Sequence, residues 1–409
     1  MTRYYIPARL PSLPPLSSPT THLLASLSYI LTNYPHPTPF HHHRYCYHGL
    51  YYGPTSISIL FLRLSSVYPD LKVRGKRFID WAREYLSPSP APSEGVPKGV
   101  SPRGCGVGAE MVVRMVVQAV MTRDEELAGW VCTLGREVVL VEDEAASDEW
   151  LYGRAGYLYL LRVLRGWFAD GGGGGGGGGW DIVSTIDSTI KTTADTILSK
   201  HGVWLWHGRA YLGAVHGSIG ILTQLVLSYT LIGTPPPKDL EIILSHILNQ
   251  QFDSGNWPSS ETSTSGDKLV QLCHGASGFV LSLATIRDAF PGLHAEIDPA
   301  IDLARETISS RGFLKKDPCL CHGVTGNALA LMACAGGEAE AEGWLAWTTR
   351  DSLDGEGGEL FLHGDEDSVD EEMGLWTGEA GRAWSFAMMD QISKGNAQWK
   401  GTLLGYNDL

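Results

Sequence analysis

Apolar residues recur along much of the chain at the spacing of amphipathic helices. Ile182, Ile186 and Ile190 lie four residues apart in the segment DIVSTIDSTIKTTADTIL. KDLEIILSHIL (238–248) and IDPAIDLARETI (297–308) show a similar pattern. Because an α-helix turns once every 3.6 residues, this spacing puts the apolar side chains on one face. These segments are predicted to be helices with one buried face and one exposed face.

A second kind of segment is apolar on all sides and follows a short turn rich in small residues. Five copies have two glycines three positions apart: Gly153 and Gly156, Gly217 and Gly220, Gly275 and Gly278, Gly323 and Gly326, Gly378 and Gly381. Two weaker copies precede them, with Gly53 and Ser56 in one and Gly106 and Ala109 in the other. A helix that is apolar all round is buried. Each G-x-x-G turn is therefore predicted to begin an inner helix.

The order of these two kinds of segment predicts the fold. Seven repeats of an outer amphipathic helix, a G-x-x-G turn and an inner buried helix can close into a ring. Strand signals are few, and strands do not alternate with helices along the sequence. We expect an all-α fold, an α/α toroid (barrel) of seven helical hairpins with the turns at one end. The whole chain, residues 1–409, is expected to form this single domain.

Three segments without helical periodicity interrupt the repeats, near residues 87–104, 170–180 and 354–372. The first is rich in proline and serine, the second contains nine consecutive glycines, and the third is acidic. A glycine run loses much conformational entropy when it is fixed, and no Gly-Lys-Ser/Thr follows to make a phosphate loop. We expect flexible surface loops. The three histidines at 41–43 are also expected to lie in a solvated loop.

Charge and composition exclude several classes of partner. The formal net charge is −14 at pH 7, whereas nucleic acids and anionic membranes need a basic face. No apolar run reaches the roughly 18 residues of a membrane span, and prolines interrupt the N-terminus where a signal peptide needs an apolar stretch. The seven cysteines are expected to be reduced thiols in a cytoplasmic protein. Peripheral association with the plasma membrane is left open.

The phrase Cys-His-Gly-x-x-Gly occurs twice in the same register, and the ring brings the two helix starts to the same end. Free cysteines are often small buried residues, but thiolate and imidazole are also the preferred ligands of zinc. The duplication favours a metal site. Spacing alone leaves its ligands open among Cys273, His274, Cys319, Cys321 and His322. Because neighbouring Cys and His side chains rarely reach one ion, we expect three protein ligands and an open coordination position, as in catalytic zinc sites.

Five longer motifs carry a family resemblance. LYGRAGYLYLL, WLWHGRAYLGAVHGSIGIL, DSGNWPSS, DKLVQLCHGASG and GFLKKDPCLCHGVTGNA are similar to the lanthionine synthetase C-like family, which comprises bacterial lantibiotic cyclases and eukaryotic LanC-like proteins. The resemblance runs from about Tyr45 to Trp384, and LKKDPCLCHG resembles the eukaryotic, glutathione-binding branch. It implies an α/α toroid of seven hairpins with a zinc ion (Zn²⁺) at its centre.

The resemblance also implies a ligand set. The family's zinc ligands fall on Cys273, Cys321 and His322, whereas His274 follows the first ligand without being one. The sequence departs from the family near these positions. Many members have tryptophan at the position of Leu272 and proline at that of Ser277, and Cys319 is unusual so close to a ligand. None of these departures removes an implied ligand.

Catalytic and glutathione-binding positions follow from the same resemblance. The family's catalytic histidine falls on His216, and an acidic residue before the third turn falls on Glu149 or on its neighbour Asp148. The lysine that contacts glutathione falls on Lys316, and an N-terminal arginine with the same role falls on Arg3. For the acidic residue, a helix cap is the alternative interpretation.

The activity implied is zinc-dependent addition of the glutathione thiol to dehydroalanine or dehydrobutyrine residues in peptides or proteins. Such peptides and glutathione are the expected partners, with no nucleic acid and no transmembrane segment. One alternative is a non-catalytic glutathione-binding or signalling scaffold with a structural zinc. Another is a glycoside hydrolase on an α/α ring, which needs two carboxylates flanking a groove. The acidic residues of this chain cluster mainly in loops.

Overall fold

The computed structural model describes residues 5–6, 16, 18–35, 48–86, 100–141, 143, 146–169, 181–264, 266–361 and 369–409. Several predictions fall outside these residues. They are the glutathione contact of Arg3, the solvated loop at 41–43, the loop at 170–180, and parts of the loops at 87–104 and 354–372.

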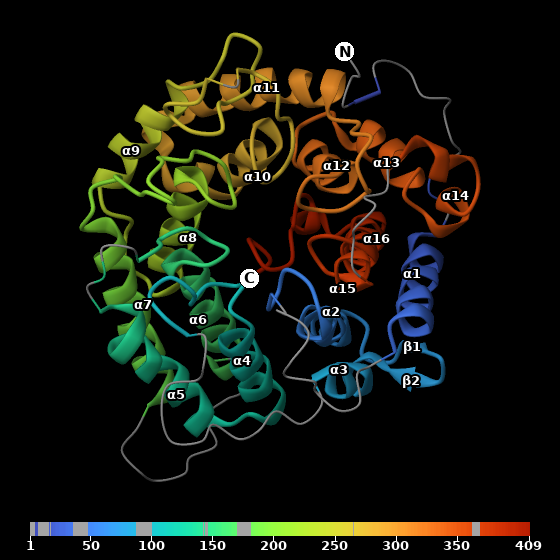
Figure 1. Ribbon diagram of the computed structural model, residues 1–409, viewed down its shortest axis with the longest axis horizontal. Helices are drawn as coiled ribbons and strands as arrows, with labels where there is room; N and C mark the ends of the chain where they lie inside the picture. Colours follow the sequence, from blue (N-terminus) through green and yellow to red (C-terminus); the bar gives the residue numbers. More distant parts are fainter. Residues whose placement is uncertain are drawn as a thin grey trace.

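An inner ring of helices surrounds the central axis (Figure 1). Its members are α2 (Pro54–Val67), α4 (Glu110–Thr122), α6 (Arg154–Ala169), α8 (Ser218–Leu231), α10 (Ala276–Ile286), α12 (Val324–Ala333) and α16 (Glu379–Ser393). Each packs against the next, and α16 packs against α2, so the ring closes. These are the segments that follow the glycine turns, and almost all residues of helices such as α8 and α12 are buried.

An outer layer of helices covers this ring. It consists of α1 (Pro19–Asn33), α3 (Phe78–Leu86), α5 (Glu125–Leu134), α7 (Ile182–Leu198), α9 (Asp239–Leu248), α11 (His294–Arg311) and α13 (Glu338–Ala346). Six of them pack on the inner helix that precedes them in the chain, whereas α1 packs on α16. The two ends of the described sequence therefore meet to form the last hairpin. On α7 the buried residues include Ile186 and Ile190, as the sequence pattern predicts.

The remaining elements of the described residues are short. They are α14 (Arg350–Leu353), α15 (Val369–Met373), the π-helix η1 (Gly135–Val139), the 3₁₀ helices η2 (Arg287–Ala289), η3 (Pro291–Leu293), η4 (Glu356–Leu360) and η5 (Ala397–Trp399), and the antiparallel strands β1 (Lys72–Val73) and β2 (Lys76–Arg77). The prediction of an all-α toroid is confirmed. Among the helices described, none has the length and hydropathy needed to cross a membrane.

The second glycine of each turn allows a close backbone approach. A Cβ added at Gly326 would lie 1.8 Å from the carbonyl oxygen of Leu320, and one at Gly278 would lie 2.1 Å from that of Leu272. In both turns the oxygen belongs to the residue six positions earlier, so any side chain would push the turn away from its helix. The same relation holds at Gly156, Gly220 and Gly381.

The turn before α4 differs from its sequence prediction. We expected Gly106 and Ala109 to hold the two glycine positions. In the structure Ala109 is the N-cap of α4, as Gly217 is the N-cap of α8. Ala109 therefore holds the first glycine position, and Val112 holds the second. Gly106 instead packs on the next turn, where a Cβ would lie 2.7 Å from the carbonyl oxygen of Leu151. The glycine is required by a contact between turns, which spacing within one turn does not reveal.

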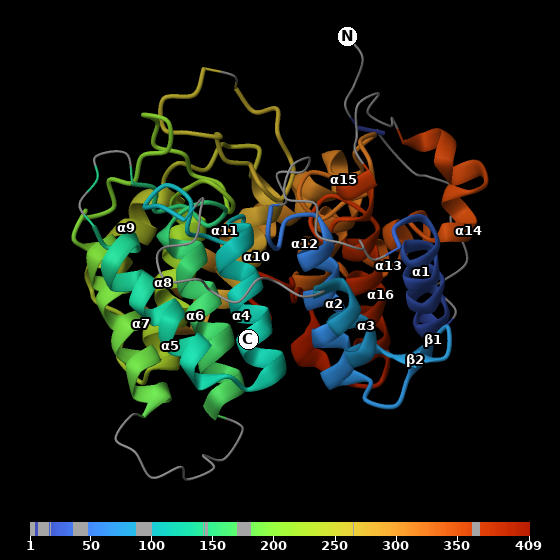
Figure 2. The same ribbon diagram turned by 60° about the horizontal axis from the view of Figure 1, so that its bottom comes forward.

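Backbone hydrogen bonds join neighbouring turns into a belt at one end of the ring. The Cys273 N–H donates to the Cys321 carbonyl at 3.0 Å, and the Cys321 N–H donates to the Trp376 carbonyl at 2.9 Å. The belt continues from Trp376 to Tyr51 (2.9 Å), from Leu50 to Val107 (2.8 Å), from Val107 to Trp150 (3.4 Å) and from Trp150 to Val215 (3.1 Å). The turns therefore gather at one end, and in Figure 2 the loop between α9 and α10 extends beyond the helices there.

The C-terminal segment fills the axis of the ring, and Figure 1 places the end of the chain near the centre. Leu404 and Tyr406 are buried. The Tyr406 hydroxyl is hydrogen bonded to Ser282 Oγ at 2.7 Å, and the Trp376 indole N–H donates to the Leu404 carbonyl at 3.2 Å. The segment is thus part of the core directly below the belt.

Candidate functional site

Adjacent turns bring two of the predicted metal ligands into contact. Cys273 precedes α10 and Cys321 precedes α12, and their side chains are hydrogen bonded to each other. Both are buried, with 7% and 3% of their surface exposed. The six cysteines in the part of the chain that is described are all free thiols. The ring thus pairs two cysteines that are far apart in the sequence, as its repeats predict.

The contact between the two cysteines shifts their pKa values in opposite directions. The hydrogen bond from Cys321 lowers the pKa of Cys273 well below its usual value, although burial opposes this. The same hydrogen bond, together with burial, raises the pKa of Cys321. Neutral donors also point at both sulfurs, since Gln271 Nε2 lies 3.0 Å from Cys273 Sγ and Tyr51 Oη lies 2.9 Å from Cys321 Sγ. Donors directed at a sulfur stabilise its thiolate, the form that binds metals, and the opposite pKa shifts favour the thiolate at Cys273 rather than at Cys321.

The third predicted ligand, His322, is hydrogen bonded to Cys319. The charge of Cys319 raises the pKa of His322 to about 9. Burial by itself would raise the pKa of Cys319, but the charge and hydrogen bonds of His322 lower it. Cys319 has no exposed surface. The structure thus adds Cys319 to the cluster, in contact with the histidine.

The donor atoms of this cysteine and histidine cluster determine whether it can hold a zinc ion. Within the described residues, no group of three or more His, Cys, Asp or Glu side chains is arranged as a metal site. The donors form two pairs instead, Cys273 with Cys321 and Cys319 with His322, and the charge of Cys273 also acts on His322. Buried thiolates and an imidazole in one cluster are the donor set that zinc prefers. The chemistry of the residues therefore fits zinc.

A second group centres on His216, just before α8. Its Nδ1 lies 2.9 Å from Glu149 Oε2. Glu149 is buried, and its carboxylate also accepts hydrogen bonds from the backbone N–H groups of Leu151 at 2.9 Å and Tyr152 at 2.5 Å. A carboxylate fixed in this way holds one tautomer of the imidazole, with the proton on Nδ1 and Nε2 left to act on a substrate. The arrangement suits proton transfer.

Asp148, the other acidic candidate, lies in a different environment. Its Oδ1 is 3.0 Å from Arg154 Nη1, and its Oδ2 is 2.5 Å from Lys200 Nζ. Both contacts are ion pairs, and Asp148 and Arg154 are buried. The structure therefore brings Glu149, and not Asp148, to His216, while Asp148 anchors the start of α6.

A tryptophan that the sequence analysis missed covers the ring of His216. Trp206 and His216 stack in parallel, with ring centroids 3.9 Å apart and an interplanar angle of 4°. Trp206 is placed by a tight turn in which His207 and Gly208 both have positive φ, 48° and 71°, and Trp206 and Arg209 exchange two backbone hydrogen bonds. Two left-handed residues in a row are typical of a type I′ turn. In the sequence, the dipeptide His207-Gly208 is the feature that could have predicted this turn.

His274, in the first Cys-His phrase, faces the proton-handling group. Its ring centroid lies 6.1 Å from that of His216 and 5.8 Å from that of Tyr211. Burial lowers the pKa of His274, and no other described residue hydrogen bonds to its Nδ1. His274 and His322 therefore hold the same place in the repeat but different surroundings.

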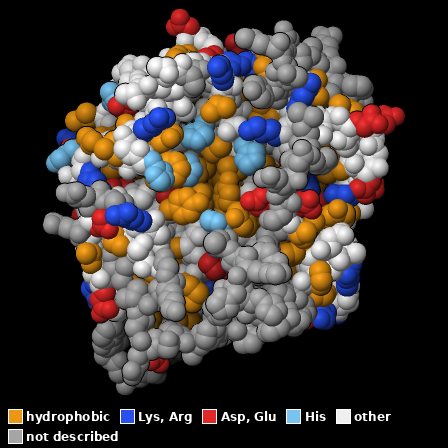
Figure 3. Space-filling view, viewed as in Figure 1, with side chains coloured by type: hydrophobic (Ala, Val, Ile, Leu, Met, Phe, Trp, Pro, Cys, Tyr) orange, Lys and Arg blue, Asp and Glu red, His pale blue; other side chains and the backbone are white. Residues whose placement is uncertain are grey.

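Lys316, the predicted glutathione contact, lies beside the thiols. Its Nζ is 3.3 Å from Gln271 Oε1, and Gln271 in turn donates to Cys273. Figure 3 shows histidine and apolar side chains around the hollowed centre of this face, with lysine and arginine side chains nearby. Basic and histidine side chains therefore gather around the opening of this face, although the whole chain is acidic.

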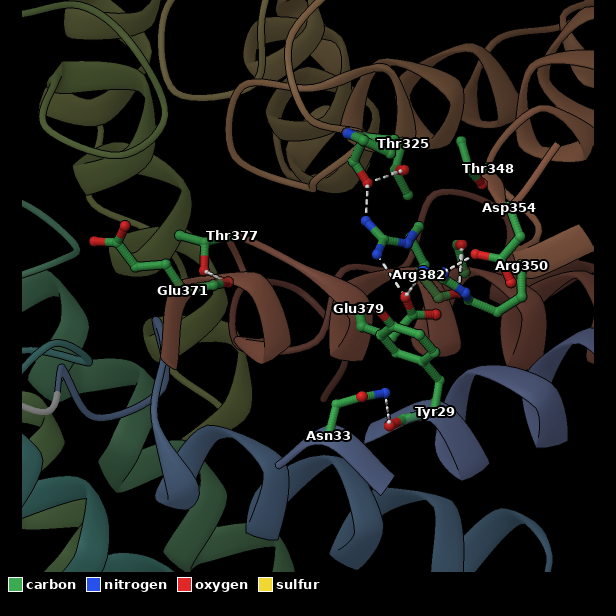
Figure 4. A network of polar contacts seen from close by, with 12 residues as sticks. Tyr29, Asn33, Thr325, Thr348, Arg350, Asp354, Glu371, Thr377, Glu379 and Arg382 are labelled. Atoms are coloured by element: carbon green, nitrogen blue, oxygen red, sulfur yellow. Dashed lines mark hydrogen bonds and ion pairs between the residues drawn. The ribbon is translucent and has the colours of Figure 1, made fainter. Parts of the chain in front are cut away.

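A cavity of about 470 Å³ opens next to His322 and Tyr51. Arg350 and Arg382 form part of its wall, and both guanidinium groups converge on Glu379, as Figure 4 shows. The volume lies in the range of small-molecule sites, which run from about 300 to 1,000 Å³. The cavity provides space for a substrate at the edge of the cysteine cluster.

Comparisons with known proteins agree with this architecture. A family model described as lanthionine synthetase C-like protein matches residues 48–404. The solved structure of nisin cyclase superposes with a TM-score of 0.50 and 13% sequence identity, covering 95% of this chain and 98% of that one. At that identity the likeness concerns the fold, and it supports the α/α toroid.

Two curated relatives match part of the sequence. LanC-like protein GCL1 of Arabidopsis thaliana is 32% identical over 192 residues, which cover 46% of this chain and 42% of that protein. Glutathione S-transferase LANCL1 of Danio rerio is 26% identical over 298 residues, or 69% of this chain and 68% of that protein. The match thus spans less than half of the first relative. Because the family model extends over most of the chain, the protein belongs to the lanthionine synthetase C-like family.

Proposed function

We propose that this protein adds the thiol of glutathione to dehydroalanine or dehydrobutyrine residues of peptides or proteins in a zinc-dependent reaction. One observation carries the proposal. A buried cluster of thiols and an imidazole lies at the same end of the ring as a histidine that a buried carboxylate orients. The first group suits thiol activation and the second suits proton transfer. The name of the Danio rerio relative, a glutathione S-transferase, supports glutathione as the thiol.

Cys273, Cys321 and His322 would hold the zinc ion. When bound, zinc would supply a positive charge that lowers the pKa of an incoming thiol and keeps it as a thiolate. Gln271 and Tyr51 donate hydrogen bonds to the two cysteine sulfurs. These donors would hold the sulfurs in place as ligands of the ion. With Cys273, Cys321 and His322 as its protein ligands, a bound zinc would have a position free for the substrate sulfur.

His216 would handle the proton of the addition. A new bond forms between the glutathione sulfur and the β-carbon, the π electrons of the double bond move to the α-carbon, and a proton must then reach the α-carbon. The thiol loses one proton and the product gains one, so no oxidant or reductant is required. His216 could deliver this proton from Nε2, because the contact of Nδ1 with Glu149 orients the ring.

Lys316 would attract the carboxylates of glutathione. It is half-buried and lies next to Gln271, which contacts the first sulfur. A cation at this place can bind a carboxylate while the glutathione thiol points at the cysteine cluster. The cavity beside His322 leaves room for the peptide that carries the dehydroamino acid.

Mass spectrometry of a dehydrobutyrine peptide, incubated with the zinc-loaded protein and glutathione, tests the proposal. We expect an adduct whose mass equals the sum of peptide and glutathione, formed faster than in the absence of protein. If no peptide in a varied panel reacts above the uncatalysed background, the enzyme proposal fails. Glutathione binding measured in the same samples would then favour the non-catalytic scaffold.

A further inference from the structure

We propose that Gln271, Tyr51 and Cys319 are positioning residues of the metal site, each one supporting a single ligand. Gln271 supports Cys273, Tyr51 supports Cys321, and Cys319 supports His322. The inference rests on the proposed function for the identity of the metal, but it concerns residues that bind neither substrate nor metal. Ligands that bind a metal generally need such outer partners to fix their orientation.

The first pair is fixed by a chain of two hydrogen bonds. Lys316 Nζ donates to Gln271 Oε1 at 3.3 Å, and Gln271 Nε2 donates to Cys273 Sγ at 3.0 Å. A lysine can only donate, so it selects the amide orientation in which the oxygen faces the lysine and the NH₂ group faces the sulfur. Gln271 is buried, with 7% of its surface exposed. The cation and the sulfur are thus connected through one side chain.

The second pair joins turns that are far apart in the sequence. The Tyr51 hydroxyl donates to Cys321 Sγ at 2.9 Å across 270 sequence positions. The backbone of Tyr51 is held by the belt, since its carbonyl accepts from the Trp376 N–H at 2.9 Å, and its ring stacks with that of Trp376 at an angle of 23°. The hydroxyl is therefore directed at the sulfur by contacts that do not depend on the metal.

The third pair uses a residue that is unusual for the family. The backbone of Cys319 is fixed, because its carbonyl accepts from the Gly326 N–H at 3.2 Å and its N–H donates to the Asp317 carbonyl at 2.7 Å. A Cβ at Gly323 would lie 2.3 Å from Cys319 N, so the two segments touch. A histidine that binds a metal with one ring nitrogen usually donates the other N–H to a fixed acceptor. The hydrogen bond between the side chains of Cys319 and His322 gives the sulfur of Cys319 that place.

The pairing also explains how three thiols can coexist with an open coordination position. A set of three cysteines and one histidine would close a tetrahedral zinc site and make it structural. In the structure Cys319 contacts His322, whereas Cys273 and Cys321 contact each other. A supporting role for Cys319 keeps the number of protein ligands at three.

Zinc affinity of the full-length protein, measured by competition with a chromogenic chelator, tests the inference. We expect Tyr51→Phe, Gln271→Leu and Cys319→Ala each to bind one zinc with about 10- to 100-fold lower affinity. Cys319→Ser, which keeps a hydrogen-bonding atom, should recover part of the loss. Matched controls are Tyr157→Phe, which removes a buried hydroxyl bonded to Val131, and Cys334→Ala, which removes a buried thiol on another segment. Both controls should bind zinc as tightly as the wild type.

Cobalt substitution gives a readout that a general loss of stability would not mimic. The intensity of the sulfur-to-cobalt charge-transfer band reports the number of bound thiolates. It should be the same in Cys319→Ala as in the wild type, with a shift of the ligand-field bands because the imidazole is less well oriented. Loss of about one third of the intensity would make Cys319 a ligand and overturn the inference.

Two further results would also overturn it: unchanged zinc affinity in all three variants, or a wild-type protein that binds no zinc. Failure of the proposed function is a separate outcome. A wild type that binds zinc but forms no glutathione adduct would refute the enzyme, while weakened zinc binding in the variants would still support the positioning residues.

Discussion

The two Cys-His-Gly-x-x-Gly turns have the same residues in the same register, yet their histidines have different neighbours. In the first turn, His274 lies near the rings of His216 and Tyr211. In the second turn, His322 is hydrogen bonded to Cys319. The two cysteines, in contrast, share their surroundings, because Cys273 and Cys321 contact each other across the boundary between the turns.

The residues outside the shared phrase account for this difference. Cys319 stands before the second turn and is hydrogen bonded to the ring of His322. The equivalent position before the first turn is Gln271, which donates a hydrogen bond to the sulfur of Cys273 instead. The duplicated motif repeats the close approach of its second glycine, at Gly278 and Gly326, whereas the first glycine differs, with a φ of 107° at Gly275 and −111° at Gly323. The chemistry of each copy depends on the side chains around it.

Removal of each histidine gives the largest expected difference between the turns. His322→Ala should lose stoichiometric zinc and all glutathione addition, because the cluster is left with two thiolates. His274→Ala should keep one zinc per chain. Metal analysis of the two purified variants, with Cys273→Ala and Cys321→Ala as references that lose zinc, provides the measurement. Equal zinc content in both histidine variants would show that the comparison of the turns is wrong.

His216→Ala should keep zinc and glutathione binding but slow the addition by about 10²- to 10⁴-fold, the usual contribution of a general acid or base. Adduct formation is followed by mass spectrometry under single-turnover conditions. His246→Ala is the matched control, since His246 is paired with Glu261 at 3.2 Å on the exposed surface. A rate equal to that of the wild type would exclude His216 from the chemistry.

The two turns should respond alike when their second glycines are replaced, because Gly278 and Gly326 both approach the carbonyl oxygen of the residue six positions earlier. Gly278→Ala and Gly326→Ala each place a Cβ within 2.1 Å of a carbonyl oxygen, and we expect each to lower the free energy of unfolding by about 1–3 kcal/mol. Gly166→Ala, in α6 with no atom within 4 Å of the new Cβ, should be neutral or stabilising. Chemical denaturation measures all three. A large effect in only one of the two turns would contradict the equivalence of these two glycine positions.

The smallest effect is expected from the replacement of Lys316, the cation that links the two turns. Lys316 precedes the second turn but contacts Gln271 before the first. Lys316→Ala should weaken glutathione binding roughly tenfold, or ~1.4 kcal/mol, through loss of a charged contact to a carboxylate. Lys315→Ala, its neighbour, serves as the control with unchanged affinity. Calorimetry that finds the wild-type affinity in Lys316→Ala would remove this lysine from the site.

Much of the candidate site follows from the sequence because it repeats a local pattern. The glycine turns predict that Cys273 and Cys321 begin neighbouring inner helices, and the belt places them side by side. Spacing could not decide between Glu149 and Asp148, since both precede the same turn. That choice depends on Arg154 and Lys200, which neutralise Asp148 and leave Glu149 to accept from His216.

Sequence periodicity by itself determined the inner and outer helices and their buried faces, because burial of apolar surface at a fixed helical period acts within each repeat. The number of repeats indicated a ring, and the contact between α16 and α2 closes it. Periodicity did not reveal contacts between repeats. Only the tertiary structure placed Tyr51 on Cys321, stacked Trp206 on His216 and filled the axis with the C-terminal segment. These contacts join residues far apart in the chain, and they arise only once the ring has closed. The local pattern of apolar residues thus predicts the fold, while packing across the ring decides the surroundings of each reactive side chain.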